Sequence, residues 1–538
     1  MQRTAFPNNI IPTSRLNPIA LNYLKYYPGA NTAGLNNGEN NFGITIADSD
    51  KYDNVLTRMD VNISDRSKLS GDFRHSDRLQ DKNRYFSNDA FGNYLRRINW
   101  GTSVDEVYTL NPSTILDVRA NWTRFHESNN SPANGIDPGS VGFGPSLAQY
   151  SQFVGLPYMQ FAGGCGANSL AFQCIGMTGD NDTPYDIFQL FGTIVKIKGN
   201  HSLKTGADLR KYRESTFPHG NSAGTFSFNS NWTNNPSVST TAAPFGQDFA
   251  AFLLGLPSSG SFDLNTHSTT KSDYYSFFLQ DDWRAKSNLT INLGLRWEHE
   301  TPTVEKYNRV INGFDPTAIN PASAAAAAAF NAKPVAQLSK FQALGGLTFA
   351  SAASPNVYTS ASSLWSPRIG AAWTPKKLGG KTVFRSGLGI FVGPNGINGG
   401  QTLNQSGFSQ TTQFTATNDN YLTPANTLSN PFPTGVVQPS GSVKGAGTFL
   451  GQAVTIFNPN VRNSYSVRWN FGVQRQIRGG MVLELAYVGN HSVHLPITTQ
   501  LDYIPRQYLS TSPQRDNNTI NLLNTTVTNR TFAAEARF

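Results

Sequence analysis

Apolar and polar residues alternate along much of this chain, and the alternating stretches occur in pairs joined by short polar turns. The clearest stretch runs from Leu289 to Glu298, where every odd position is apolar and every even position is polar or glycine. A period of two residues indicates a β-strand with one apolar and one polar face. Six pairs of such stretches predict six β-hairpins. Their strands cover residues 55–63 and 68–76, 100–110 and 114–125, 187–197 and 202–212, 274–283 and 289–298, 366–374 and 381–391, and 465–474 and 481–489.

The connections within each pair are tight, whereas those between pairs are long and polar. The long connections cover residues 77–99, 126–186, 213–273, 299–364 and 392–464. A regular alternation of short and long connections is expected when all tight turns lie at one end of a cylinder and all long loops at the other, as in outer-membrane barrels. The predicted strands also reach the ~9–11 residues of a tilted membrane-spanning strand. We therefore predict an all-β fold, a transmembrane antiparallel β-barrel with long extracellular loops.

This fold assigns the two faces of each strand to different surroundings. The apolar face should meet lipid, and Trp122, Trp283, Trp297 and Trp373 are expected in an aromatic girdle. The polar residues expected to face the lumen are Arg58, Asp60, Asp117, Arg119, Lys204, Asp208, Arg210, Arg296, Glu298, Arg385 and Arg468. The residues expected to face lipid are Val61, Leu116, Val118, Leu203, Leu209, Ile291, Leu293, Leu295, Val467 and Phe471.

Composition narrows the alternatives. Of 538 residues, 12% are aromatic and only 14% are charged, against about 25% charged in a typical soluble domain. The 48 glycines and many aromatics disfavour a helical protein, and the aromatics also disfavour wholesale disorder. The net charge of +9 is not gathered into basic runs, so nucleic acid is not an expected partner. A soluble β-sandwich or propeller array remains the alternative fold, against which stand the strand lengths and the lack of a fixed repeat.

The candidate chemistry is sparse. Asp48, Asp50 and Asp53 lack the glycine and the distal glutamate of a calcium loop. No nucleophile elbow, Walker loop or zinc helix is present, so we expect neither catalysis, nor a metal, nor a cofactor. Cys165 and Cys174 lie in one long connection, and a disulfide between them is expected in an oxidising compartment.

Two segments of the long connections depart from the strand pattern. Residues 245–256 predict a short amphipathic helix, and residues 321–344, which include an alanine run, predict a helix within a loop or low-complexity filler.

Seven short motifs occur in the order in which they are found in TonB-dependent outer-membrane receptors. They are His201–Gly206, Phe252–Pro257, Gln280–Trp283, Leu289–Glu298, Ser366–Trp373, Arg385–Phe391 and Ala486–Gly489. The chain most resembles the Oar-like subgroup, which has an N-terminal carboxypeptidase-regulatory-like domain. The resemblance implies a 22-stranded barrel closed by a plug.

The two ends of the chain are expected to lie within such a barrel. Phe6–Pro28 resembles a loop that follows the plug, so residues 1–538 are expected to be a barrel segment without plug or regulatory-like domain. At the other end, Leu501–Asn524 resembles a loop that leads into further strands, so the chain is expected to be truncated at both ends. Phe532, Ala534, Ala536 and Phe538 alternate either as a terminal barrel strand does or by chance after such a truncation.

The function implied by the resemblance is TonB-dependent uptake of a nutrient such as a glycan, a peptide or a metal chelate. The implied partners are outer-membrane lipid, the TonB complex acting through a plug, the barrel-assembly machinery and an unidentified small ligand. The implied location is the outer membrane of a Gram-negative-type bacterium. Two other functions stay open at this point: a passive outer-membrane pore or adhesin, and a secreted soluble β-rich glycan-binding protein.

Overall fold

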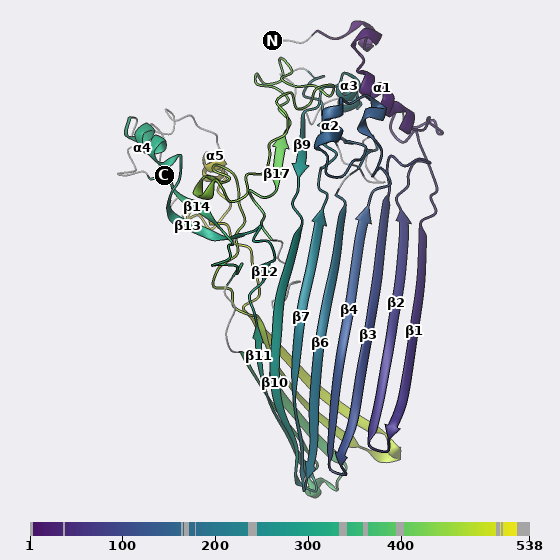
Figure 1. The fold of residues 1–538 in the computed structure, drawn as a ribbon, viewed down its shortest axis with the longest axis vertical. Helices are drawn as coiled ribbons and strands as arrows, with labels where there is room; N and C mark the ends of the chain where they lie inside the picture. The colour runs from purple at the N-terminus through teal and green to yellow at the C-terminus, as the bar shows by residue number, and fades with distance from the viewer. Residues whose placement is uncertain are drawn as a thin grey trace.

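The computed structural model describes residues 4–35, 38–162, 165, 172–177, 179–234, 245–332, 342–358, 364–393, 403–501, 506 and 509–524. Its main feature is one curved sheet of long antiparallel strands (Figure 1). Twelve strands follow one another in the order β1-β2-β3-β4-β6-β7-β10-β11-β15-β16-β18-β19, and a thirteenth, β12 (Val304–Glu305), pairs with β10. The twelve strands and their neighbours are those predicted from the alternation, so the predicted all-β fold is confirmed.

The bounds of the twelve strands show how far the ladders continue. The strands are β1 Ser49–Ser64, β2 Ser67–Lys82, β3 Asn93–Asn111, β4 Thr114–Asn130, β6 Asn181–Lys198, β7 His201–Pro218, β10 Ser268–Lys286, β11 Leu289–Glu300, β15 Leu364–Trp373, β16 Thr382–Val392, β18 Tyr465–Gln476 and β19 Val482–Val493. From β1 to β11 every strand extends beyond its predicted end on the side of the long loops. Beyond the apolar region both faces of a strand contact water, so the sequence stops alternating although the hydrogen-bonded ladder continues.

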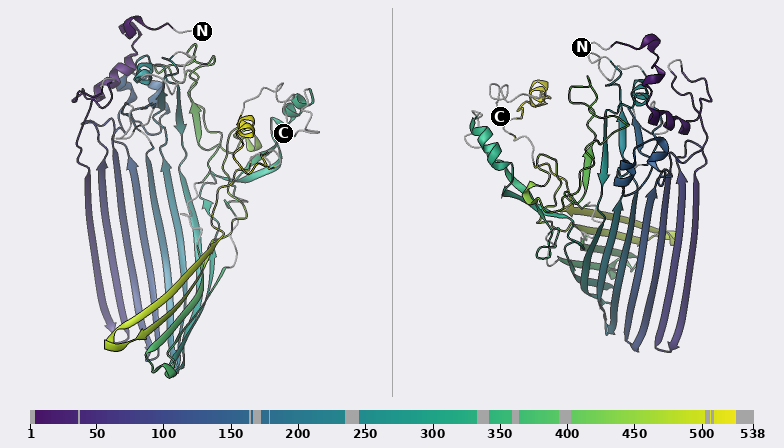
Figure 2. Two further views of the ribbon diagram at one scale, coloured as in Figure 1. Left: turned by 180° about the vertical axis from the view of Figure 1, so that it is seen from behind. Right: turned by 45° about the horizontal axis from the view of Figure 1, so that its top comes forward.

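The sheet has the predicted asymmetry between its two ends. The tight turns, such as the one at Gly199 between β6 and β7, lie at one end, and the long connections emerge at the other (Figure 1). Gly199 has φ = 58°, a left-handed conformation that glycine adopts without steric cost. The sheet curves strongly, so that β18 and β19 slope across behind β1–β7 in Figure 1 and cross in front of them in the left view of Figure 2. Within the described residues β1 pairs only with β2, and β19 only with β18, so both are edge strands.

Above the loop ends of β1–β10 lies a compact region that we call the cap (Figure 1). It holds a four-stranded sheet of β17 (Gln410–Gln413), β9 (Ser259–Leu264), β8 (Thr225–Phe228) and β5 (Tyr158–Phe161). Three helices pack beside it: α1 Pro18–Tyr23, α2 Pro145–Tyr150 and α3 Gln247–Leu253. Residues from the N-terminal segment and from four long connections share one apolar core, in which Tyr23, Phe161, Phe226, Phe252 and Phe262 are fully buried. The cap is therefore a folded unit rather than a set of independent loops.

The predicted helix at 245–256 is confirmed as α3, and the one at 321–344 as α4 (Ser323–Ala332), with residues 333–341 outside the described part of the chain. Near α4 lie a hairpin of β13 (Ile311–Ile319) and β14 (Leu344–Phe349), and later in the chain α5 (Asn517–Asn524). In the described part of the chain there are also seven short 3₁₀ helices: Pro7–Asn9, Thr13–Arg15, Leu24–Tyr26, Pro138–Val141, Lys376–Leu378, Gly445–Gly447 and Arg478–Gly480. The alternating residues Phe532, Ala534, Ala536 and Phe538 lie outside the described residues.

In the described part of the chain, no helix has the length and apolarity that a membrane crossing requires.

Candidate functional site

The strand registers separate the residues predicted for the lumen from those predicted for lipid. Residues opposite each other in an antiparallel pair point to the same side of the sheet, and successive residues along a strand point to opposite sides. Following the registers from β1 to β19 puts all eleven predicted lumen residues on one face, which we call the polar face. All ten predicted lipid-facing residues lie on the other, the apolar face. That these faces meet the lumen and the lipid stays a prediction.

Four of the predicted polar residues meet in one ion-pair cluster in the middle of the polar face. The Asp208 carboxylate lies 2.6 Å from the Arg210 guanidinium and 3.5 Å from that of Arg296. Arg296 also lies 3.0 Å from Glu298, which accepts a hydrogen bond from the Tyr274 hydroxyl at 2.5 Å. The Asp208 side chain is only 4% exposed. Because both arginines share this buried carboxylate, the cluster fixes β7 against β10 and β11.

The other predicted polar residues are less buried. Arg119 pairs with Asp105 at 3.1 Å, with Asp117 on the same face, whereas the pair of Arg58 and Asp60 is more than 60% exposed at the edge of the sheet. Among the described residues, three predicted cations have no carboxylate within ion-pair distance: Lys204, Arg385 and Arg468. The polar face therefore combines paired charges with cations that remain open to a ligand.

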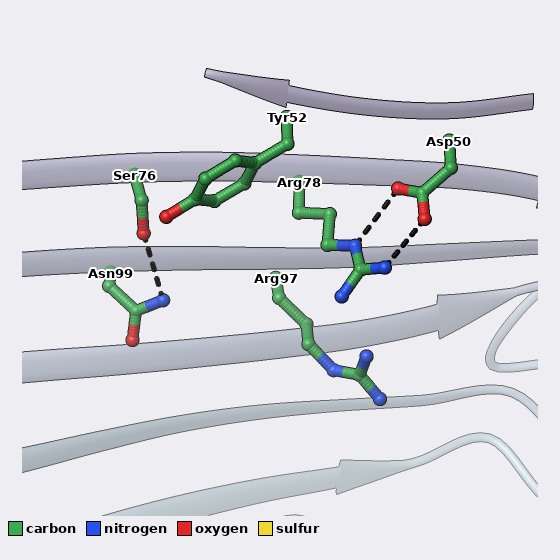
Figure 3. A pocket seen from close by; sticks show the side chains of 6 residues that line it. All are labelled: Asp50, Tyr52, Ser76, Arg78, Arg97 and Asn99. Carbon is green, nitrogen blue, oxygen red and sulfur yellow. Dashed lines mark hydrogen bonds and ion pairs between the residues drawn. The ribbon is translucent and has the colours of Figure 1, made fainter. Parts of the chain in front are cut away.

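A hollow of about 550 Å³ lies on the polar face near the loop end of β1–β3 (Figure 3). It is lined by Asp50, Tyr52, Ser76, Arg78, Arg97 and Asn99. Arg78 donates two hydrogen bonds to Asp50, at 2.9 and 2.5 Å, and the Arg97 Nε donates to Glu127 at 2.7 Å. Arg78 and Arg97 are direct cross-strand neighbours, an unfavourable like-charge pair that these two carboxylates offset.

Sequence reasoning missed this hollow because Asp50, Arg78 and Arg97 lie beyond the predicted ends of their strands. The sequence suggests at most a calcium ligand at Asp50. In the structure its carboxylate accepts hydrogen bonds from Arg78. The sequence feature that could have revealed the site is the run of polar residues on either side of residue 77. There the paired strands continue although apolar and polar residues no longer alternate.

The apolar face carries seven of the eight tryptophans. They are Trp100, Trp122, Trp283, Trp297, Trp365, Trp373 and Trp469. The remaining one, Trp232, is buried in the cap. Leu293, Leu295 and Phe471 on the same face are 43–50% exposed, an apolar surface that needs a non-aqueous neighbour.

The height of the apolar region matches a membrane. On β6 the apolar-face positions between Asp186 and Lys196 are all uncharged, and these two charged residues are ten positions apart. Ten strand residues span about 34 Å, or about 24–28 Å along the normal at a tilt of 35–45°. An outer-membrane barrel has an apolar band about 25 Å tall.

The cap is tied together covalently and by buried polar groups. The sulfurs of Cys165 and Cys174 are bonded to each other, and Cys174 lies in the shared apolar core. At the base of the cap the Asp180 carboxylate accepts a hydrogen bond from the Ser131 N–H at 2.9 Å and lies 4.0 Å from the His219 ring. Burial raises the pKa of Asp180 to about 6 and lowers the pKa of His219.

Asp180→Asn should stabilise the cap at pH 7.5 by about 1–2 kcal/mol and leave it unchanged at pH 4. Between about pH 4 and pH 6 the Asp180 carboxyl is protonated in the folded state and ionised in the unfolded chain. The contribution of Asp180 to the stability of the folded state therefore falls as pH rises through this window. The depressed pKa of His219 acts in the opposite direction, since stability then rises with pH up to the unfolded value. Hydrogen exchange of cap amides at both pH values measures the effect. A cap destabilised by the substitution at pH 7.5 would contradict this expectation.

Within the described ranges, no three His, Cys, Asp or Glu side chains are grouped closely enough to hold a metal ion.

Comparison with known proteins places this fold among membrane barrels. The family model of the outer membrane beta barrel domain matches residues 1–537. No curated protein matches the chain in sequence. Similar solved structures include a variant of the ferric enterobactin receptor from Pseudomonas aeruginosa (11% identity, 86% of this chain and 45% of that one, TM-score 0.37). Others are the ferric-catecholate import receptor Fiu of E. coli K12 (9%, 82% and 51%, 0.38) and the alcaligin outer membrane receptor from Bordetella pertussis (6%, 82% and 44%, 0.37). The chain thus spans about half the length of these receptors.

Proposed function

Because the chain belongs to the outer membrane β-barrel domain family, we propose that it is the barrel wall of a receptor of the Oar-like group that takes up a nutrient by TonB-dependent transport. The chain is located in the outer membrane, which disfavours the alternative of a secreted soluble glycan-binding protein. The proposal assigns no bond-making or bond-breaking step to the chain.

The observation that carries the proposal is a charged face of the sheet backed by a predominantly apolar one. The Asp208 cluster on β7 and β11 and the Arg78 hollow on β1–β3 lie on the same face of the sheet, and the open cation Lys204 lies on this face of β7 as well. A face of this kind suits a wet lumen that polar solutes cross. The nutrient would be held by this face and by the cap, and the energy would come from the TonB complex. Insertion by the barrel-assembly machinery is also part of the proposal.

Growth of the source bacterium in three defined media tests the function. Iron is supplied only as a chelate, nitrogen only as peptides, or carbon only as an oligosaccharide. We expect deletion of the gene to slow growth in one of the three media, and deletion of the TonB gene to reproduce that defect. Reintroducing the intact gene should restore growth. No defect in any medium, or a defect that loss of TonB does not reproduce, would contradict the proposal.

A passive pore remains the second candidate, because the polar face would also suit unassisted diffusion. Purified protein in a planar bilayer separates the two. A receptor should show no steady open conductance in the full-length protein, whereas a pore should conduct in stable single-channel steps. Stable single-channel conductance steps would contradict the receptor proposal and support a passive pore.

A further inference from the structure

A row of cations lies on the apolar face directly beyond the apolar band, on the side of the long loops. Arg124 lies on β4, Lys211 and Arg213 on β7, and Lys271 on β10, with β6 between β4 and β7, and all four side chains are exposed. Reading outward along β7, the apolar-face residues are uncharged from Leu203 to Leu209 and then become Lys211 and Arg213. The cations therefore begin where the band ends.

These cations are poorly neutralised by the chain itself. Asp186 is fully engaged, since Arg124 binds it at 2.7 and 2.9 Å and the Trp122 Nε1–H donates to it at 3.1 Å. The strand registers also place Asp186 opposite Arg213 and Asp273 opposite Lys211, but among the described residues no carboxylate lies within 4 Å of the amino or guanidinium nitrogens of Lys211, Arg213 or Lys271. Only a ring contact is found, with Arg213 lying 5.7 Å from the centre of the Phe188 ring.

Two of these cations are placed directly opposite each other. The β7–β10 register pairs Arg213 with Lys271, and like charges at directly opposite positions destabilise a sheet. The Arg78–Arg97 pair on the polar face has the same arrangement, but there each arginine has its own carboxylate. On the apolar face the aspartate opposite Arg213, Asp186, is bound by Arg124, so the Arg213–Lys271 pair has no ion-pair partner among the described residues.

The position of the pair identifies that anion. The long loops of an outer-membrane barrel are extracellular, so the row lies at the level of the lipid headgroups of the outer leaflet, beside the ring of Trp122. A phosphate group is the anion that lipid headgroups offer at this level. Arginine binds a phosphate through paired N–H donors, and lysine adds a mobile point charge.

We infer that Arg213 and Lys271, with Lys211 beside them, form a binding site for a phosphate group of an outer-leaflet glycolipid. The lipid's acyl chains would lie along the uncharged face formed by Leu209, Ala207 and Phe277 below the site. This site is independent of the transported nutrient, because it lies on the face of the sheet opposite the Asp208 cluster.

Binding of a purified bisphosphorylated glycolipid to the full chain in detergent micelles tests the site, with native mass spectrometry as the readout. Each cation removed near an anionic lipid surface should weaken binding about fivefold. We therefore expect Arg213→Gln combined with Lys271→Gln to weaken binding about 25-fold. Two matched double variants should bind like wild type: Arg78→Gln with Arg97→Gln on the polar face, and Lys196→Gln with Lys198→Gln at the turn end of the apolar face.

Wild-type protein provides a second measurement that does not depend on the folding of a variant. The same glycolipid without its phosphates should bind at least tenfold more weakly, and added salt should weaken only the phosphorylated form. Equal binding of the two glycolipids would overturn the site. Competition by millimolar inorganic phosphate that abolishes glycolipid binding would show a free-anion site and would overturn its assignment to lipid. Equal weakening by the turn-end variant would overturn its position.

Discussion

Leu295→Arg should lower the free energy of unfolding of the barrel by about 2–4 kcal/mol, because it places a guanidinium on the apolar face near the middle of the bilayer. Leu295 lies centrally on β11, opposite the uncharged residues Leu279 on β10 and Pro367 on β15, and its side chain is 46% exposed. Denaturant unfolding of the chain in lipid vesicles, followed by tryptophan fluorescence, measures the change.

The substitution Asn292→Arg on the same strand is the matched control. Asn292 lies three residues before Leu295 and points to the polar face, where it donates a hydrogen bond to Asp282. An arginine there would lie beside that carboxylate in water, so the free energy of unfolding should change little. Equal losses for the two variants would show that the two faces have been wrongly assigned.

Asp208→Asn should lower the free energy of unfolding of the barrel by about 3–5 kcal/mol, the loss found when one partner of a buried ion pair is removed. The carboxylate accepts hydrogen bonds from Gln189 at 2.8 Å and from Arg210 at 3.0 and 2.6 Å. Arg296 also approaches it, at 3.5 Å. Without the negative charge, two guanidinium groups would face each other across β7 and β11. The same unfolding measurement detects the loss.

Asp60→Asn provides the comparison for this second variant. Asp60 also pairs with an arginine two residues away, Arg58, but both side chains are more than 60% exposed. Exposed pairs contribute little to stability because water screens them, so no measurable change is expected. If both variants were equally unstable, burial of the Asp208 cluster would not explain its effect. A stable Asp208→Asn variant would contradict the role of the cluster in holding the strands together.

The membrane-facing part of the fold could be predicted because two solvents impose a period of two on the sequence. From Leu289 to Glu298 apolar residues alternate with polar residues and glycine, so each position indicates the face on which its side chain lies. The same argument fails for β10, which begins at Ser268, six residues before its predicted start. There the side chains on one face, Ser268, Thr270 and Ser272, are buried although they are polar, so burial no longer coincides with apolar residues and the sequence carries no apolar–polar alternation.

The cap could not be predicted because its contacts join segments that are distant along the chain. Tyr23 is fully buried and its hydroxyl donates to the Pro157 carbonyl at 2.8 Å, while the Asn17 side chain bonds Ser429 across more than 400 residues. Each segment alone is a polar loop with scattered aromatics. Within the cap only α3 is predicted by its sequence, since Phe249, Phe252 and Leu253 recur at helical spacing.

The candidate site was predicted in part for the same reason. Asp208 and Arg296 lie on strands with clear alternation, so their common face followed from the sequence, although their contact did not. Arg78 and Arg97 lie in the wet extensions and were missed. Arg213 and Lys271 were missed because residues just past the apolar band look like the start of a polar loop.

A single-cysteine scan along β11 tests most directly whether the two faces of the sheet meet lipid and water. The native cysteines are bonded to each other, so each introduced thiol is the only one expected to react. Residues 290–297 are replaced one at a time, and the full chain in lipid vesicles is treated with a charged, membrane-impermeant maleimide. Labelling should alternate, with residues 292, 294 and 296 reacting quickly and residues 291, 293 and 295 protected. Uniform labelling of both sets, or protection of the even positions, would contradict the lipid-facing and lumen-facing assignment.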